Sequence, residues 1–215
     1  MKRLVYFFDP VSPYAWLAFD ALPQALEGCS YWVDHQPVLF AGLLRHWGHK
    51  GPAEIPPKRD WTYRHVAWLA ARQGTTLQLP AAHPFNPLPL LRLALACAPA
   101  GGLPNRRVVE ALFRHAWAAG GADASDPERL AALTAALAPT RDPQGEAVKA
   151  ELRAATEAAA SAGVFGVPTF GLDGRLFWGL DALPMLAACL KGDPWFGSGV
   201  WEDAAAPRPA AARPG

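Results

Sequence analysis

The sequence predicts an α/β fold in which a βαβ unit near the N-terminus and a ββα unit near the C-terminus are separated by a long helical insertion. Three observations support this. A β-prone apolar run opens the chain at residues 4–8, helical patterning dominates residues 40–162, and two short β-prone stretches follow, joined by the hairpin signal Asp173-Gly174. With 215 residues, 51% of them hydrophobic and 18% charged, the chain can bury a sizeable core.

The first forty residues carry the signals of the βαβ unit. The run at 4–8 is continuous rather than alternating, which is typical of a strand covered on both faces. Ser12 followed by Pro13 matches an N-cap and a first helical residue, so a helix should begin there and stop at Gly28. Residues 31–39 are again β-prone and complete the unit.

The remaining elements follow in the same way. Breaks rich in Pro and Gly divide residues 40–162 into several helices. Strands are expected over residues 167–172 and 175–178, and a last helix over residues 182–190 with Asp181 as its N-cap.

This order of elements is the thioredoxin-like plan with an all-helical domain inserted in the middle. Residues 1–39 and 163–202 would form the discontinuous thioredoxin-like domain, and residues 40–162 the inserted one. Residues 203–215 consist mainly of Ala, Pro and Arg without periodicity, so they are predicted to be disordered.

Charge and cysteine usage exclude several classes of function. Twenty basic residues against nineteen acidic ones leave a net charge of +1, so no overall field attracts nucleic acid or an anionic membrane. Apolar runs fall short of the roughly 18 residues of a membrane span, and without an export signal we expect a cytoplasmic protein. Cys29, Cys97 and Cys189 are far apart, odd in number and in no C-x-x-C or Cys/His cluster, so the sequence indicates neither a disulfide framework nor a zinc site, and the three are expected to be buried thiols.

The loop at residues 9–14, Asp-Pro-Val-Ser-Pro-Tyr, is the first candidate site, because it joins the first strand to the first helix. The N–H groups and partial positive charge of a helix N-terminus can stabilise a thiolate. The loop contains no cysteine, which excludes a dithiol oxidoreductase there. Ser12 could donate a hydrogen bond to a thiolate from a ligand; the alternative is that it only caps the helix.

A second candidate site is the loop Gly-Val-Phe-Gly-Val-Pro-Thr-Phe at residues 163–170. In thioredoxin-like proteins a cis-proline in this place faces the first helix, and the residue before it offers backbone N–H and C=O groups to a peptide-like ligand. Pro168 and Val167 would take these parts. The alternative is an ordinary edge-strand proline.

Two charged positions give weaker signals. Asp181 precedes the last helix, where a carboxylate either caps the helix or holds an ammonium group. Lys58 and Arg59 open a predicted helix, where the macrodipole disfavours cations, so a carboxylate ligand nearby would account for them. Solvated surface charge is the alternative for this pair.

Together these motifs resemble the 2-hydroxychromene-2-carboxylate isomerases, relatives of the kappa-class glutathione transferases in the DsbA-like branch of thioredoxin folds. The resemblance covers about residues 4–190, and five motifs in the same order carry it. They are Phe8-Asp9-x-x-Ser12-Pro13-Tyr14, Gly51-Pro52 with Lys58, Asn86 with Leu91-Arg92, Gly163 to Phe170, and Phe177-Trp178-Gly179-x-Asp181.

The resemblance implies that glutathione is a cofactor regenerated in each turnover. Its sulfur would face Ser12, the catalytic residue, and its cysteine backbone would pair with Val167 beside Pro168. Its γ-glutamyl end would lie near Leu180 and Asp181. The thiolate would add to an unsaturated aromatic carboxylate and leave again after rotation about the former double bond.

The resemblance also implies contacts to the substrate and leaves a homodimer open. Lys50, Lys58 and Asn86 are candidates for the carboxylate and hydroxyl groups of the small aromatic substrate. Tyr14 and Trp61 could cover its flat ring.

The chain departs from the family at several positions. Leu180 and Ala182 flank Asp181 where the family often has an asparagine and an arginine, which predicts weaker glutathione binding. His65 and Trp68 replace an aspartate and an arginine, so the substrate stays open. A kappa-type transferase or peroxidase is the alternative function, and a non-catalytic thioredoxin-like binding module is the third.

Overall fold

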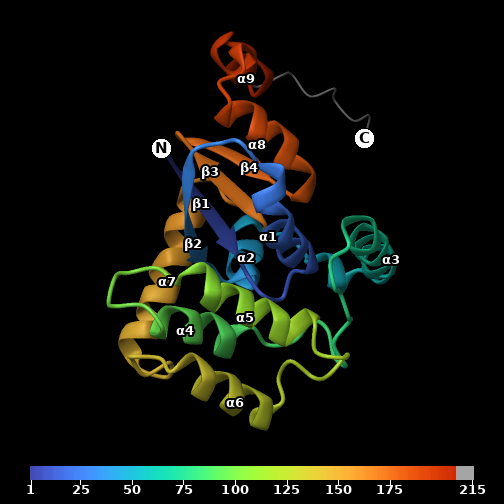
Figure 1. The fold of residues 1–215 in the computed structure, drawn as a ribbon, viewed down its shortest axis with the longest axis vertical. Helices are drawn as coiled ribbons and strands as arrows, with labels where there is room; N and C mark the ends of the chain where they lie inside the picture. The colour runs from blue at the N-terminus through green and yellow to red at the C-terminus, as the bar shows by residue number, and fades with distance from the viewer. Residues whose placement is uncertain (207–215) are drawn as a thin grey trace, which may run out of the picture.

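The computed structural model describes residues 1–206 and contains a four-stranded mixed sheet in the order β2-β1-β3-β4 (Figure 1). The central strand β1 (Lys2–Phe8) pairs in parallel with β2 (Tyr31–Pro37) and antiparallel with β3 (Thr169–Leu172). The edge strand β4 (Arg175–Trp178) pairs antiparallel with β3. The βαβ and ββα units therefore meet at β1, as the thioredoxin-like plan predicts.

Helices cover β1 on both faces, which explains its continuous apolar sequence. Leu4, Tyr6 and Phe8 are fully buried in the core that they share with α1 (Pro13–Ala25) and α8 (Leu183–Leu190). On the opposite face Phe7 packs against a smaller cluster that includes residues of the first and last helices of the insertion and Val167 of the loop before β3.

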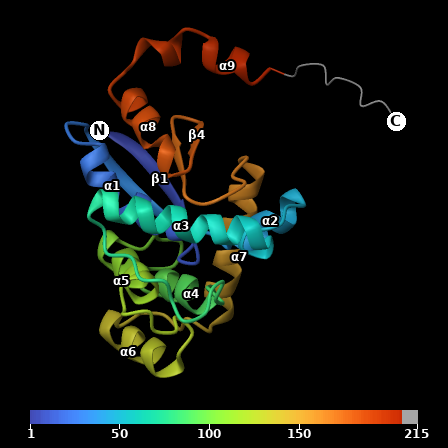
Figure 2. The ribbon, with the colours of Figure 1, turned by 90° about the vertical axis from the view of Figure 1, so that its right-hand side faces the viewer.

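The insertion breaks where Pro and Gly predict it to. Its elements are α2 (Phe40–Trp47), the short 3₁₀ helix η1 (Pro52–Glu54), α3 (Pro56–Gln73), α4 (Leu88–Ala96), α5 (Arg106–Trp117), α6 (Pro127–Leu137) and α7 (Glu146–Ser161). In Figure 1, α4, α5 and α6 lie below the sheet. In Figure 2 the longest helix of the insertion, α3, lies across the molecule between α1 and α2, above α4 and α5.

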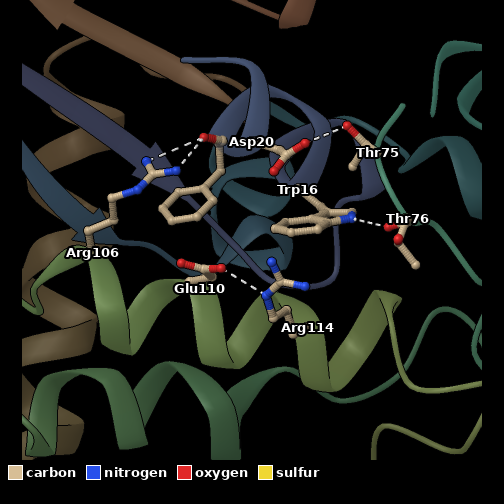
Figure 3. A network of polar contacts seen from close by, with 8 residues as sticks. Trp16, Asp20, Thr75, Thr76, Arg106, Glu110 and Arg114 are labelled. Atoms are coloured by element: carbon tan, nitrogen blue, oxygen red, sulfur yellow. Dashed lines mark hydrogen bonds and ion pairs between the residues drawn. The ribbon is translucent and has the colours of Figure 1, made fainter. Parts of the chain in front are cut away.

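Hydrogen bonds connect α1 to this insertion (Figure 3). The Trp16 indole Nε1 donates to the Thr76 carbonyl at 2.9 Å, and the Thr75 hydroxyl donates to the Asp20 carboxylate. Arg106, the first residue of α5, reaches a backbone carbonyl of α1. Since the main hydrophobic core also joins the sheet, α1 and α5, the insertion supports the helix whose N-terminus forms the first candidate site.

The predicted hairpin is present, and the strand before it is shorter than expected. Asp173 and Gly174 have φ values of 49° and 79°, the positive pair that a type I′ turn requires. β3 begins at Thr169 rather than at Val167, and Pro168 has no N–H to offer a ladder at that point.

The C-terminal part differs from the prediction in two places. The 3₁₀ helix η2 (Leu180–Ala182) precedes α8 (Leu183–Leu190), and η3 (Pro194–Gly197) and α9 (Val200–Ala204) follow it. α9 thus extends two residues into the predicted disordered tail, because Trp201 packs on Phe177 with ring centroids 5.4 Å apart. Positions 207–215 of that tail lie outside the described residues.

Two further expectations concern the cysteines and the membrane. Only Cys189 is buried; Cys29 and Cys97 are partly exposed at the edge of the core, so the prediction of three buried thiols is wrong for two of them. Within residues 1–206, none of the helices has the length and apolar character needed to cross a membrane. The division into two domains stays a prediction.

Candidate functional site

Ser12 occupies the position predicted for it at the N-terminus of α1. It is buried, its backbone is extended, and its hydroxyl accepts a hydrogen bond from the Ala15 N–H at 3.2 Å. Pro13 is the first helical residue, and the first turn of α1 carries no acidic side chain. The partial positive charge at this helix end is therefore not offset within the first turn.

The loop at residues 163–170 lies directly against this helix end. The Val167–Pro168 peptide bond is cis, and the Ser12 hydroxyl donates to the Val167 carbonyl at 3.3 Å. Among the described residues the Val167 N–H has no hydrogen-bond acceptor, so it is free to pair with a peptide-like ligand. The two candidate loops, far apart in sequence, thus form one site.

Two aromatic side chains border this loop. The Trp178 indole lies so close to Gly166 that a Cβ added there would be 2.7 Å from Nε1, which accounts for a glycine at this position. Phe165 packs against Trp178 with ring centroids 4.9 Å apart, and both rings remain more than one third exposed. They form an apolar wall next to the Val167 backbone.

Asp181 lies beside the site but does not cap the last helix as predicted. The N-cap position of α8 is Ala182, which has no side chain able to accept a hydrogen bond, and Asp181 is the middle residue of η2. Its carboxylate turns back towards Gly179, which has φ 98° and leaves no room for a Cβ beside the Asp181 oxygen. Asp181 is exposed, so its charge is available to a ligand.

A backbone contact connects this turn to the cis-proline loop. The Gly179 N–H donates to the Pro168 carbonyl at 2.9 Å. Leu180, next in the chain, is half-buried against the core. The three loops that the resemblance assigns to glutathione are therefore adjacent.

Tyr14 faces the insertion across the site. Its hydroxyl lies 2.9 Å from His65 Nδ1, and Trp61 stacks on the His65 ring with centroids 5.6 Å apart. Burial raises the pKa of Tyr14, and the negative charge of Asp181 raises it further, while a hydrogen bond with Thr62 lowers it. His65 thus contacts both Tyr14 and Trp61. From the sequence it was noted only as a departure from the family pattern.

The role of the other three predicted substrate residues stays a prediction. Lys50 and Lys58 are exposed, and the Asn86 side chain accepts from a backbone N–H at the start of α4. Within residues 1–206 no hydrogen bond or ion pair joins any of the three to Ser12 or Val167.

Asp9 belongs to the first family motif, and it is a buried residue of the site for which the sequence predicted no role. Its two carboxylate oxygens accept from the Val11 and Phe40 N–H groups, each at 2.9 Å. Burial raises its pKa to about 7, although both hydrogen bonds lower it. Asp9 links the Ser12 loop to the start of α2, and an aspartate before a proline is the available signal for such a turn.

Two side chains of the insertion hold the remaining carbonyls of the same loop. His83 Nε2 lies 2.8 Å from the Val11 carbonyl, and the Trp117 indole donates to the Pro10 carbonyl at 2.8 Å. No local pattern reveals them, because their partners lie 72 and 107 residues away.

The chemistry open to these groups depends on what a ligand brings, because the loop itself lacks a cysteine. Among the described residues no cluster of three or more His, Cys, Asp or Glu side chains could hold a metal ion. The Val167 N–H could pair with a peptide-like backbone, and the Ser12 hydroxyl at the N-terminus of α1 could stabilise a sulfur anion.

Comparison with known proteins identifies a family and several relatives of similar length. The family model for the DSBA-like thioredoxin domain matches residues 3–191. The chain is 26% identical to glutathione S-transferase kappa 1 of Rattus norvegicus over 91% of its length and 93% of the relative's. It is 26% identical to 2-hydroxychromene-2-carboxylate isomerase of Sphingobium xenophagum over 88% of its length and 98% of the relative's.

A solved structure agrees in fold. A selenomethionine form of 2-hydroxychromene-2-carboxylate isomerase aligns with a TM-score of 0.74 and 20% identity, covering 95% of this chain and all of that one.

Proposed function

The chain belongs to the DsbA-like thioredoxin family, and we propose that it is a glutathione-dependent cis–trans isomerase. Its substrate would be 2-hydroxychromene-2-carboxylate or a similar unsaturated aromatic carboxylate. The observation that carries the proposal is the hydrogen bond between the Ser12 hydroxyl and the Val167 carbonyl beside Pro168, at the N-terminus of α1. The similarity to an isomerase and to a kappa transferase supports it.

The residues present fit glutathione. The Val167 N–H has no acceptor among the described residues, so it can pair with the cysteine backbone of the tripeptide. The Ser12 O–H, which now donates to a carbonyl, can rotate towards a sulfur at the positive end of α1. The exposed Asp181 carboxylate would hold the ammonium group of the γ-glutamyl end, with Leu180 beside it.

Bound glutathione would supply a thiolate whose reversible addition turns the substrate's double bond into a single bond that can rotate. Ser12 would keep that sulfur ionised at neutral pH by donating a hydrogen bond to it. Tyr14 and Trp61 would cover the flat ring, and His65 would hold the Tyr14 hydroxyl in place. Lys50, Lys58 and Asn86 remain candidates for the substrate carboxylate.

A kappa-type glutathione transferase or peroxidase is the second candidate function, and the similarity to a kappa 1 transferase favours it. It would use the same thiol site. The two functions differ in stoichiometry, because an isomerase regenerates glutathione whereas a transferase or peroxidase consumes it.

Two measurements test the proposal. Calorimetric titration with glutathione should give one site per chain. An assay with 2-hydroxychromene-2-carboxylate should then give the trans product without loss of glutathione. Consumption of glutathione would support the transferase or peroxidase instead, and absence of glutathione binding would overturn both and leave a binding module. The cytoplasmic location and a homodimer stay predictions.

A further inference from the structure

We propose that His83, supported by Tyr63, is a positioning residue that fixes the Val11–Ser12 peptide unit from the inserted helices and thereby controls how well the site stabilises a thiolate. This goes beyond the proposed function, because it concerns any sulfur anion held at the N-terminus of α1. The motifs that carry the family resemblance contain neither residue.

The hydrogen bonds define one tautomer of His83. A carbonyl oxygen can only accept, so Nε2, 2.8 Å from the Val11 carbonyl, must carry the proton. The neutral ring then has an acceptor at Nδ1, and the Tyr63 hydroxyl lies 2.8 Å from it. The same hydroxyl lies 3.2 Å from the His83 carbonyl; through the shorter contact Tyr63 donates to Nδ1 and favours the tautomer that holds Val11.

The ring of His83 is also fixed by packing. Its centroid lies 5.3 Å from that of Trp117 and 6.0 Å from that of Phe85. Burial lowers the pKa of His83, so the side chain acts as a neutral donor rather than as a charge. A donor held by packing and by a second hydrogen bond places its partner more accurately than a mobile one.

The Val11–Ser12 peptide unit is held at both ends. His83 binds its carbonyl, and its N–H, which belongs to Ser12, donates to the Asp9 carbonyl at 3.0 Å. The plane of this peptide fixes the Ser12 N–Cα bond, about which the Ser12 φ angle of −91° directs Cβ. The orientation of the Ser12 hydroxyl, towards both the helix end and Val167, thus depends on a contact from the insertion.

The test places the sulfur in the chain itself, so that it needs no glutathione. In a Ser12→Cys chain, the rate of alkylation by iodoacetamide is followed against pH, with mass spectrometry selecting the peptide that contains position 12. The same measurement is made with His83→Ala, His83→Gln or Tyr63→Phe added. His115→Ala is the matched control, because His115 Nε2 also binds a backbone carbonyl, that of Ala124, at 3.0 Å.

We expect His83→Ala to lower the ionisation constant of the thiol at position 12 roughly three- to tenfold, the usual scale of one hydrogen bond, so that the thiolate fraction at the parent's midpoint pH falls roughly two- to fivefold. His83→Gln, which keeps an N–H donor, should restore most of it, and Tyr63→Phe should give a smaller loss. His115→Ala should leave the titration unchanged.

Two outcomes overturn the inference. One is an unchanged titration in folded His83→Ala. The other is an equal shift in His115→Ala, which would indicate general loosening. If His83→Ala does not fold, the titration of the thiol at position 12 in the Tyr63→Phe chain is the test. An unchanged titration in that chain overturns the proposal. Failure of the native chain to bind glutathione would overturn the proposed function alone, since this readout contains no glutathione.

Discussion

The Ser12 hydroxyl and the Val167 carbonyl lie 3.3 Å apart although 155 residues separate them in the chain. The contact joins the N-terminus of α1 to the cis-proline loop. It gives Ser12 two roles, as a helix cap through Ala15 and as a donor in the site. The two roles predict different effects of substitution.

Ser12→Ala should lower turnover much more than stability. Loss of the cap costs about 1 kcal/mol of unfolding free energy. Loss of a hydrogen bond to a thiolate should lower kcat/KM roughly tenfold or more, the usual scale for a bond to a charged group. Asn105→Ala is the control, because Asn105 caps α5 by accepting from the Val108 N–H at 3.0 Å. An equal loss of stability with full activity in both variants would reduce Ser12 to a cap.

Asp181→Asn should weaken glutathione binding without changing stability. Because Asp181 does not cap α8, the free energy of unfolding should stay within about 0.5 kcal/mol of the parent. The loss of charge opposite the ligand ammonium should cost about 1.5–3 kcal/mol of binding, measured by calorimetry. Asp126→Ala should show the reverse, since Asp126 caps α6 by accepting from the Arg129 N–H at 2.9 Å. Unchanged glutathione affinity in Asp181→Asn would place the γ-glutamyl group elsewhere.

Trp61→Ala should raise KM for the aromatic substrate roughly three- to tenfold, with kcat and glutathione affinity unchanged, because an aromatic contact contributes about 0.5–1.5 kcal/mol. Trp61 is 63% exposed, so its removal leaves the core intact. Trp32→Ala is the matched control, because Trp32 is also exposed, at 42%, but lies away from the site. It pairs with Arg3 near the start of β1, whereas Ser12 follows the other end of that strand. The same KM in both variants would remove Trp61 from the substrate site.

His35 should make the protein less stable as the pH falls from about 6.5 to 4. Burial, with a smaller contribution from the charge of Arg106, lowers its pKa to about 4. Between these values the unfolded chain binds a proton that the folded chain does not, so unfolding is favoured as pH falls. The total is roughly 3 kcal/mol.

Urea denaturation of the parent and of His35→Gln at pH 7, 6, 5 and 4 isolates this contribution. The glutamine cannot titrate, so the unfolding free energy of the parent minus that of His35→Gln should fall as the pH falls. Contributions from other titrating groups are the same in both chains and cancel in this difference. Buried Asp9 is such a group, because its pKa is raised to about 7 and its protonation favours the folded state at low pH in both chains. A difference that stays constant with pH would contradict the assignment to His35.

The sequence by itself predicted the order of the elements, because their signals are local. A continuous apolar run gave β1, Ser12-Pro13 gave the start of α1, and Asp173-Gly174 gave the hairpin. Pro and Gly marked the breaks between the inserted helices. The same local chemistry placed Ser12 and Val167 in candidate loops, since a helix N-terminus and a proline before a strand can be recognised from a few neighbouring residues.

Which of these side chains meet depends on tertiary packing. A carboxylate before a predicted helix looks like a cap, but the extra 3₁₀ turn moves Asp181 one residue too far from α8 to serve as one. The pairing of Tyr14 with His65 and of Val11 with His83 depends on how α3 and the segment after it pack beside α1. Packing of this kind arises from the summed burial of many side chains, and no short stretch of sequence records it.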